Sequence, residues 1–143
     1  MSRGKIIIRT NVLLGGVFVA HIPIETVPYL ESAIYLPMLL TVLEKDYAEV
    51  EAGQFKLKRP YIKLIEKAKE SALDDLKKTK TYLKEHQLKV IRGSSDELFT
   101  EYSFHFQQTM EVRRYSNIRL RNQVEDLLNR YLFMASKNPN QNQ

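Results

Sequence analysis

The stretch LKVIRGSSDELFTEYSFHF, residues 88–106, decides the fold expected for the second half of the chain. Within it Tyr102, Phe104 and Phe106 occupy every second position and alternate with polar residues. This is the spacing of one face of a pleated strand. The Gly-Ser-Ser-Asp run at 93–96 is turn-forming. Together these features predict a β-hairpin.

The arms of this predicted hairpin are Leu88–Arg92 and Leu98–Phe106. The alternative is one long helix that Asp96 caps and that continues through Met110. We favour the strand, because aromatic residues at two-residue spacing would spread around most of a helix.

The segment before the hairpin, from Pro60 to His86, has the clearest helical pattern in the chain. Proline is suited to the first turn of a helix. One face is apolar over about six turns at 3.6 residues per turn, and the other faces are charged. That apolar face consists of Tyr61, Ile65, Ala68, Ala72, Leu76, Thr79 and Leu83. The preceding residues, Gln54–Arg59, are either a short strand or a loop.

Helical spacing also appears between Ile24 and Gly53. Thr26 can cap a short turn that has Pro28 near its start, and Pro37 can open a longer helix, where its missing N–H is tolerated. The apolar stripe of this longer helix consists of Leu36, Leu39, Leu40, Leu43, Tyr47 and Val50. It should end near Gly53.

The N-terminal stretch LLGGVFVAHIPI, residues 13–24, could be a secretion signal, a membrane segment or a piece of the fold. Arg9 and Asn11 interrupt the window of roughly 20 apolar residues that a membrane span needs. Phe18 stands where a signal cleavage site needs a small residue.

A hairpin explains this stretch better. Gly15 and Gly16 can form a two-residue turn, which places Val12 opposite Val19. Both faces of such a hairpin are apolar, so helices or a second subunit must cover them. Export remains the alternative interpretation.

From about Thr109 the spacing becomes helical again. The apolar face of this terminal helix consists of Leu120, Val124, Leu127, Leu128, Tyr131 and Leu132. Residues 136–143 are rich in Asn, Gln and Pro and are expected to be disordered. We therefore predict a single globular domain, residues 1–135, of the α+β class. It has an N-terminal β-hairpin, amphipathic helices, a second β-hairpin and a long C-terminal helix.

Residue types that carry catalysis or hold metals are not grouped in the sequence. The chain has no cysteine, which excludes thiolate chemistry, disulfides and Cys-ligated zinc. Its three histidines show no HExxH-type pairing, and Glu101 with His105 could share a metal only on a helix. The sequence contains no glycine-rich phosphate loop and no G-x-S-x-G elbow. We expect no enzymatic activity, no cofactor and no metal.

Basic charge is concentrated in one part of the chain. The formal net charge is +5, and residues 55–92 carry 12 Lys/Arg against 5 Asp/Glu. A surface that binds phosphates needs cations gathered in one place. Candidates are Lys56, Lys58, Arg59, Lys77, Lys78, Lys80, Lys84, Lys89 and Arg92. The alternative is a solvated helix face, because acidic residues are interleaved with these lysines.

The order of elements over residues 37–106 resembles that of winged-helix domains. In those domains a helix enters the major groove of DNA and the following hairpin touches the backbone. The resemblance requires a turn between two helices, so the helix at 60–86 would have to break near Ser71. It implies that Lys77, Thr79, Lys80 and Lys84 contact the groove or phosphates and that Arg92 contacts DNA from the wing.

A second basic group stands at the start of the predicted terminal helix. It consists of Arg113, Arg114, Arg119 and Arg121, followed by Asn122 and Gln123. These residue types can make bidentate contacts with base edges. They are also ordinary residues of a helix surface, and nothing in the sequence places them beside the lysines.

We therefore expect a cytoplasmic, non-enzymatic protein that binds nucleic acid, with double-stranded DNA held by the basic helix and hairpin. The alternative is a protein-interaction or assembly module that acts through apolar hairpin and helix surfaces. Homodimerisation through the first hairpin or the C-terminal helix is expected under either interpretation. Salt separates the two, because phosphate binding weakens steeply with ionic strength.

Overall fold

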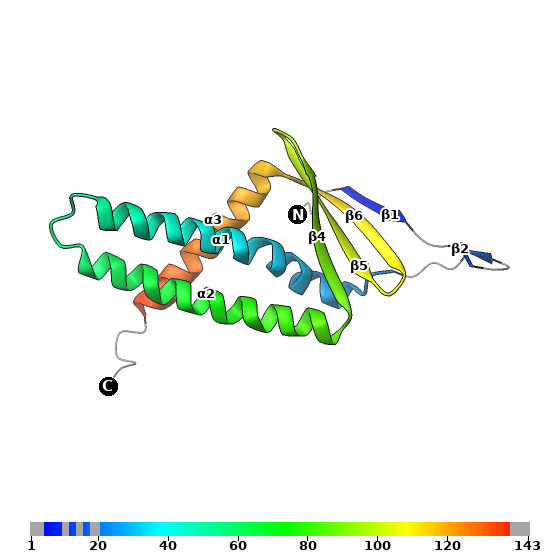
Figure 1. Ribbon diagram of the computed structural model, residues 1–143, viewed down its shortest axis with the longest axis horizontal. Coiled ribbons are helices and arrows are strands. Elements are labelled where there is room, and N and C mark those ends of the chain that lie inside the picture. The colour runs from blue at the N-terminus through cyan, green and yellow to red at the C-terminus, as the bar shows by residue number, and fades with distance from the viewer. Residues whose placement is uncertain (1–4, 10–11, 14–15, 18–20, 138–143) are drawn as a thin grey trace.

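The computed structural model describes residues 5–9, 12–13, 16–17 and 21–137 (Figure 1). It is an α+β fold with a long C-terminal helix, as predicted. In chain order the elements are β1 (Lys5–Arg9), β2 (Val12–Leu13), β3 (Gly16–Val17), the short 3-10 helix η1 (Ile24–Thr26), α1 (Val27–Ala52), α2 (Arg59–Glu85), β4 (Leu88–Ser95), β5 (Phe99–Phe106), β6 (Thr109–Ser116) and α3 (Asn117–Ser136).

An antiparallel sheet, with strand order β1-β6-β5-β4, lies at one end of the molecule, and the α1–α2 pair extends away from it (Figure 1). The predicted hairpin is confirmed as β4 and β5, with Val90 opposite Phe104. Strand β4 continues through Ser95, however, so the predicted turn at 93–96 is wrong, and the chain turns at 96–98. The Asp96 carboxylate accepts hydrogen bonds of 2.8 Å from the backbone N–H groups of Phe99 and Leu98. These bonds close the turn and hold the pKa of Asp96 below its ordinary value. Asp96 therefore caps a turn between strands and not a long helix.

Residues 109–116 form strand β6, and the prediction of helix from Thr109 is wrong. The chain reverses into β6 at Gln107, which has a left-handed φ of 56°. The strand alternates between buried and partly buried positions. Three of its buried residues are polar or charged, namely Thr109, Glu111 and Arg113, and the fourth is Tyr115. Hydropathy therefore does not follow burial along β6, and the sequence lacks the alternation of apolar and polar residues that predicts a strand.

Helix α3 begins at Asn117, eight residues later than predicted. Its N-cap is Ser116, whose hydroxyl accepts a 3.0 Å hydrogen bond from the backbone N–H of Arg119. A serine in this role satisfies one of the free N–H groups of the first turn.

A single helix, α1, replaces the turn and separate helix predicted on the two sides of Pro37. Proline inside a helix costs roughly 3 kcal/mol. The apolar stripe continues across it, since Leu30 and Ile34 before the proline and Leu39 and Leu43 after it are buried. Burial of each such side chain stabilises the fold by about 1.5–3 kcal/mol, which together exceeds the cost of the proline.

Helix α2 is unbroken from Arg59 to Glu85 and has Pro60 in its first turn, as predicted. It contains no turn at Ser71, because neither Gly nor Pro interrupts its helical spacing. The structure therefore does not confirm the winged-helix arrangement, which needs two helices in this place. Helix α1 ends before Gly53, its C-cap, as predicted, and residues 54–58 form a loop and not a strand.

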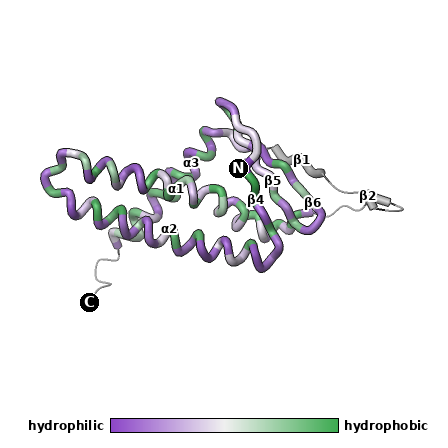
Figure 2. Tube along the Cα trace, in the orientation of Figure 1, coloured by the Kyte–Doolittle hydropathy of each residue, from purple (hydrophilic) through white to green (hydrophobic). Residues whose placement is uncertain are grey.

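Two groups of buried apolar side chains fill the fold, and α1 contributes to both. The sheet core lies between the sheet and the first half of α1 and consists of Ile22, Val27, Leu30, Ile34, Leu83, Leu88, Tyr102, Phe104, Tyr115 and Leu120. The bundle core lies among the three helices and consists of Leu36, Leu39, Leu43, Ile65, Ala68, Ala72, Val124 and Tyr131. Hydrophobic and hydrophilic residues recur along α1 and α2 in Figure 2, which fits helices that bury one face.

The N-terminal strands differ in register from the predicted hairpin. In the β2–β3 pair Val12 lies opposite Val17, so the pairing of Val12 with Val19 is wrong. Residues 14, 15 and 18–20, and positions 138–143 of the predicted tail, lie outside the described residues.

The segment Ile24–Ala52 is long and apolar enough to cross a membrane, by length and composition alone. Its buried side chains pack into both the sheet core and the bundle core. The core helix of a globular fold meets the same criteria.

Candidate nucleic-acid interface

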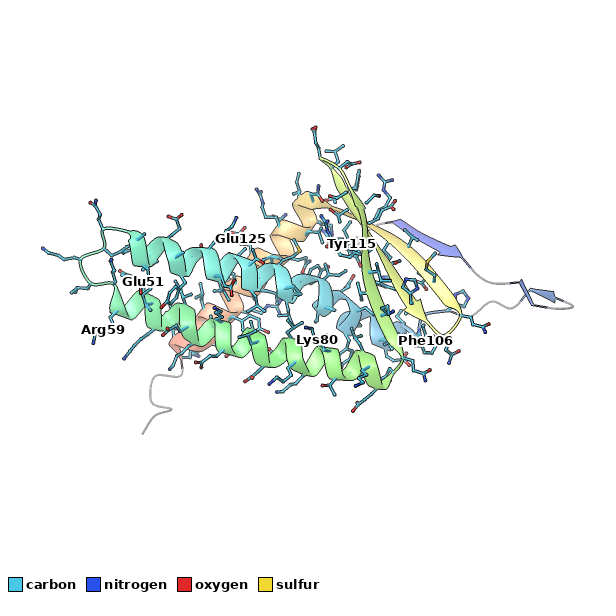
Figure 3. All side chains as sticks on the ribbon, in the orientation of Figure 1. Glu51, Arg59, Lys80, Phe106, Tyr115 and Glu125 are labelled. Carbon is cyan, nitrogen blue, oxygen red and sulfur yellow. The ribbon has the colours of Figure 1, made fainter. Side chains whose placement is uncertain are left out.

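A basic groove of about 530 Å³ runs between the C-terminal half of α2 and strand β4. Four cationic side chains line it: Lys80 and Lys84 from α2, and Lys89 and Arg92 from β4. The other lining residues are apolar or aromatic, and none is acidic. We refer to these four residues as the groove cations; Lys80 is labelled in Figure 3.

Local structure explains how the groove cations meet. Lys80 and Lys84 are one helical turn apart on α2, so they share a face. After Glu85 the chain reverses within two residues, with Gln87 in the left-handed region at φ 57°. The reversal lays β4 back against α2, so Lys89 and Arg92 both line the groove, although their side chains leave opposite faces of this edge strand.

Among the described residues, no carboxylate lies within 4 Å of a groove cation as an ion-pair partner. All four side chains belong to exposed residues. Among the described residues, ion pairs within 4 Å join Lys69 to Glu44, at 3.3 Å, and Arg113 to Glu111, at 3.2 Å. Neither pair involves a groove cation, and the lining of the groove is cationic with no acidic side chain.

Three other residues predicted as DNA contacts on α2 differ in position. Thr79 is buried, with 6% of its surface exposed, and the prediction that it contacts DNA is wrong. It faces the core because it lies four residues before Leu83, which is also buried. Lys77 and Lys78 are exposed outside the groove, and Lys77 lies one turn before Lys80.

The remaining basic residues of the 55–92 segment form a separate group at the α1–α2 loop. This loop cluster consists of Lys56, Lys58 and Arg59. Arg59 and Lys80 are 21 residues apart on one helix, or about 30 Å at 1.5 Å per residue (Figure 3). Glu51 lies in the same hollow, and the Lys58 ammonium donates a 2.6 Å hydrogen bond to its backbone oxygen. The loop cluster and the groove therefore cannot act as one compact site.

The structure does not bring the second basic group together. Arg113 and Arg114 lie on β6 and not on the terminal helix. Arg113 is buried: it pairs with Glu111 and lies 4.9 Å from the Phe104 ring centroid, so the prediction that it contacts DNA is wrong. Residues 113 and 114 point to opposite faces of the sheet, and Arg114 lies over the Phe99 ring at 4.3 Å. Arg119 and Arg121 are on α3, as predicted.

The histidines lie apart from one another. His105 shares a 2.9 Å hydrogen bond with the Ser103 hydroxyl, and His86 stacks on the Tyr82 ring at 3.9 Å. Glu101 and His105 are both on strand β5, so they lack the helical spacing that a shared metal would need. In the part of the chain that the structure describes, no three His, Cys, Asp or Glu side chains are placed to hold a metal ion.

Comparison with known proteins gives a family for this chain. Residues 21–136 match the model of the YhjD protein family. The chain is 37% identical over 113 residues to a protein of Bacillus subtilis (strain 168) described as "Uncharacterized protein YhjD". The aligned region covers 79% of this chain and 94% of that protein. No solved structure matches the chain. From the family match and the similarity to the Bacillus protein, we conclude that the chain belongs to the YhjD protein family.

Proposed function

We propose that this protein is a non-enzymatic nucleic-acid-binding protein that holds the phosphates of double-stranded DNA with its groove cations. The observation that carries the proposal is a groove with two lysines from a helix, a lysine and an arginine from a strand, and no acidic side chain. Such a surface lowers the free energy of a bound polyanion through Coulomb attraction and through release of condensed counterions.

The spacing of the groove cations suits a chain of phosphates better than a single one. Lys80 and Lys84 are about 6 Å apart along the helix axis. Lys89 and Arg92 are about 10 Å apart along the strand. Phosphates follow one another at about 3.4 Å along the axis of one DNA strand, so the groove can engage two or three in sequence.

The experiment is a titration of fluorescently labelled mixed-sequence duplex DNA with the protein, followed by anisotropy over a series of salt concentrations. Two or three phosphate contacts predict a slope of log affinity against log salt of about −2 to −3. A variant with all four groove cations changed to Gln should lose roughly a hundredfold or more in affinity at 0.1 M salt. Labelled single-stranded DNA tests whether the duplex is preferred.

The matched control removes the same charge at the far end of the molecule, at four exposed residues: Lys45, Lys56, Arg59 and Lys63, each changed to Gln. We expect this control to keep its affinity within a few fold. Equal losses in the two variants would show that only net charge matters. No binding by the native protein at low salt would overturn the proposal.

A second candidate function, self-assembly through an apolar surface, is supported by the C-terminal end of α3. Phe133 and Met134 are adjacent there, with 60% and 51% of their surfaces exposed. Large apolar side chains in such a position can be covered by a second subunit. Sedimentation of the native protein and of a variant with both changed to Ser tests this, because an apolar interface should resist salt while DNA binding should not.

A further inference from the structure

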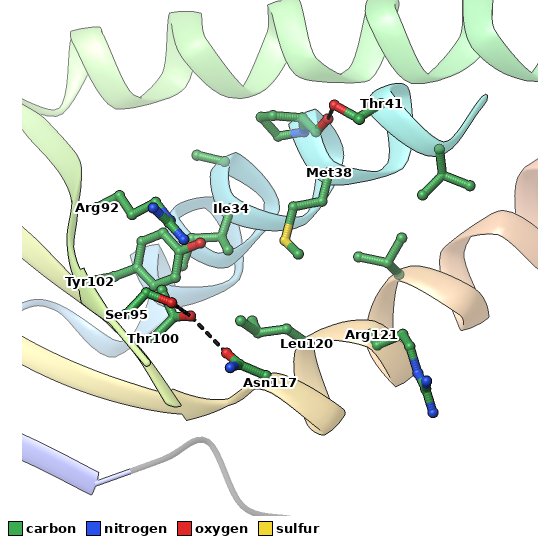
Figure 4. Close-up of a pocket in the computed structure, with 14 residues that line it drawn as sticks. Ile34, Met38, Thr41, Arg92, Ser95, Thr100, Tyr102, Asn117, Leu120 and Arg121 are labelled. Atoms are coloured by element: carbon green, nitrogen blue, oxygen red, sulfur yellow. Dashed lines mark hydrogen bonds between the residues drawn. The ribbon is translucent and has the colours of Figure 1, made fainter. Parts of the chain in front are cut away.

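A second cavity, of about 680 Å³, lies between α1, α3 and the inner face of the sheet (Figure 4). Its volume is in the range of small-molecule sites. Ile34, Leu120 and Val124 are buried residues of its wall, and the Met38 side chain extends into the space between α1 and α3 (Figure 4). A ligand with an apolar body would find suitable contacts in this wall.

Three uncharged polar side chains of the cavity gather at its sheet end. There the Thr100 hydroxyl donates a 2.7 Å hydrogen bond to the Asn117 side-chain oxygen and lies 3.0 Å from the Ser95 hydroxyl (Figure 4). The Asn117 amide donates a 2.9 Å bond to the backbone oxygen of Asp96. These groups bond to one another, so they fix the shape of this end of the cavity.

The charged residues that line the cavity are both cationic. They are Arg92 on β4 and Arg121 on α3, and the lining includes no Asp or Glu. Figure 4 shows the Arg92 guanidinium beside the Tyr102 ring, at the sheet end, whereas the Arg121 side chain extends away from Met38. Arg92 has no carboxylate partner within 4 Å among the described residues. Its donors are therefore available to an anion at the polar end.

A strand irregularity places Ser95 on the same side of β4 as Arg92. The register of β4 against β5 shifts between Arg92, which faces Tyr102, and Ser95, which faces Thr100. Residues three apart on a regular strand point to opposite faces, but an extra residue restores the same face. The bulge thus puts both Arg92 and Ser95 on the cavity wall.

We infer that this cavity binds a small amphipathic carboxylic acid. The alkyl chain lies against Met38, Ile34 and Leu120, and the carboxylate pairs with the Arg92 guanidinium. A guanidinium can bind a carboxylate through two parallel hydrogen bonds, which gives both affinity and orientation. The chemistry of the cavity wall supports this assignment, because the wall is mostly apolar and its charged residues are cationic, with no acidic side chain. It does not depend on DNA binding, and it is measured with a different readout.

The test uses NMR of protein labelled with ¹³C at the methionine methyl groups, titrated with octanoate or with 1-octanol. The chain has four methionines. Met38 lines the cavity, whereas Met110 on β6 and Met134 on α3 lie outside it and act as internal controls. We expect octanoate to shift the Met38 signal in a saturable way and to leave those of Met110 and Met134 unchanged. Octanol, which lacks the charge, should bind at least tenfold more weakly.

Arg92→Gln should remove this preference of octanoate over octanol, and Lys56→Gln, a matched loss of charge in the loop cluster, should retain it. Arg92 is exposed, so the variant should fold, and the Met110 and Met134 signals report whether it does. The inference is overturned if octanoate leaves the Met38 signal unchanged, if octanol binds as tightly, or if the Arg92 variant keeps the preference.

Discussion

The helical end of the molecule and its sheet end bury different kinds of side chain. The bundle core consists of Leu, Ile, Val and Ala with one Tyr. At the sheet end Thr100, Thr109, Glu111 and Arg113 are buried beside the apolar residues of the sheet core. The basic groove and the Arg92-containing cavity are also at the sheet end. The comparison indicates that the helices provide a uniform scaffold, while the polar sheet end is where binding is expected.

The largest effect that tests this comparison is expected at Glu111. Its carboxylate accepts hydrogen bonds from the Arg113 guanidinium, at 3.2 Å, and from the Ile22 backbone N–H, at 3.3 Å. Glu111→Ala leaves the Arg113 charge buried without a partner, which destabilises a protein by about 3–5 kcal/mol. The free energy of unfolding, from urea denaturation followed by circular dichroism, measures this loss.

The control for this prediction replaces both partners. A double variant, Glu111→Leu with Arg113→Met, removes the unpaired charge and should recover most of the loss. Recovery should be incomplete, because the Ile22 N–H still lacks its acceptor. In the bundle core, Leu39→Ala provides the apolar comparison, with an expected loss of about 2–5 kcal/mol from cavity formation. A loss below 1 kcal/mol for Glu111→Ala would contradict the importance of the buried pair.

The same difference explains which parts of the fold could be predicted from the sequence. Helix α2 was predictable because its buried and exposed faces differ in hydropathy, as Ile65 and Ala68 on the buried face illustrate. Strand β6 was not, because Glu111 and Arg113 occupy buried positions and reverse the expected pattern. Helix α1 was predicted in two parts, because the effect of Pro37 depends on packing that only the tertiary structure reveals.

The candidate site was predictable in composition but not in arrangement. Each groove cation was recognisable as part of a basic segment. The helix lysines and the strand cations come together because the chain reverses at Gln87. Glutamine is not among the residue types that favour turns, so the sequence does not indicate this reversal. The cavity depends on the bulge after Arg92 and on the Thr100–Asn117 hydrogen bond, which joins residues 17 positions apart. Contacts of this kind leave no periodic signal in a single sequence.

A smaller effect on stability is expected at the bundle end, at Tyr131. Its hydroxyl donates a hydrogen bond to the Asp75 carboxylate. Burial, followed by the bond to Asp75 and its charge, raises the pKa of Tyr131 above its ordinary value of 10.0. Tyr131→Phe should cost about 1.5–3 kcal/mol at neutral pH, the usual range for a hydrogen bond to a charged group.

This tyrosine also predicts a dependence on pH. Because the pKa is raised in the folded state, the unfolded chain loses its proton first, and the stabilisation falls as pH rises above about 10. The midpoint of thermal unfolding, measured between neutral and alkaline pH, should therefore decline more steeply for the native protein than for Tyr131→Phe. Parallel declines would show that the hydroxyl makes no differential contribution.

Next in size are effects on DNA affinity from single charges, which compare the groove with the loop cluster. Lys84→Gln removes one groove cation and should reduce the slope of log affinity against log salt by about one. The affinity at 0.1 M salt should fall roughly fivefold. Lys56→Gln, with the same change of charge about 30 Å or more away along the helix pair, should leave the slope unchanged. Anisotropy titrations of the two variants over the same series of salt concentrations measure the two slopes. Equal slopes would show that the DNA-contacting surface does not include Lys84.

The smallest effect links the groove to the cavity, since Arg92 lines both. If the carboxylate of octanoate occupies the Arg92 guanidinium, that residue no longer contacts phosphate, and saturating octanoate should weaken DNA binding by no more than Arg92→Gln does. The expected factor is roughly fivefold or less, the contribution of one cation. Thermodynamic linkage requires DNA to weaken octanoate binding by the same factor, which the Met38 signal can report. Octanol should have little effect, and in Arg92→Gln the coupling should vanish. Simultaneous binding of octanoate and DNA with no mutual effect would mean that Arg92 serves only one of the two sites.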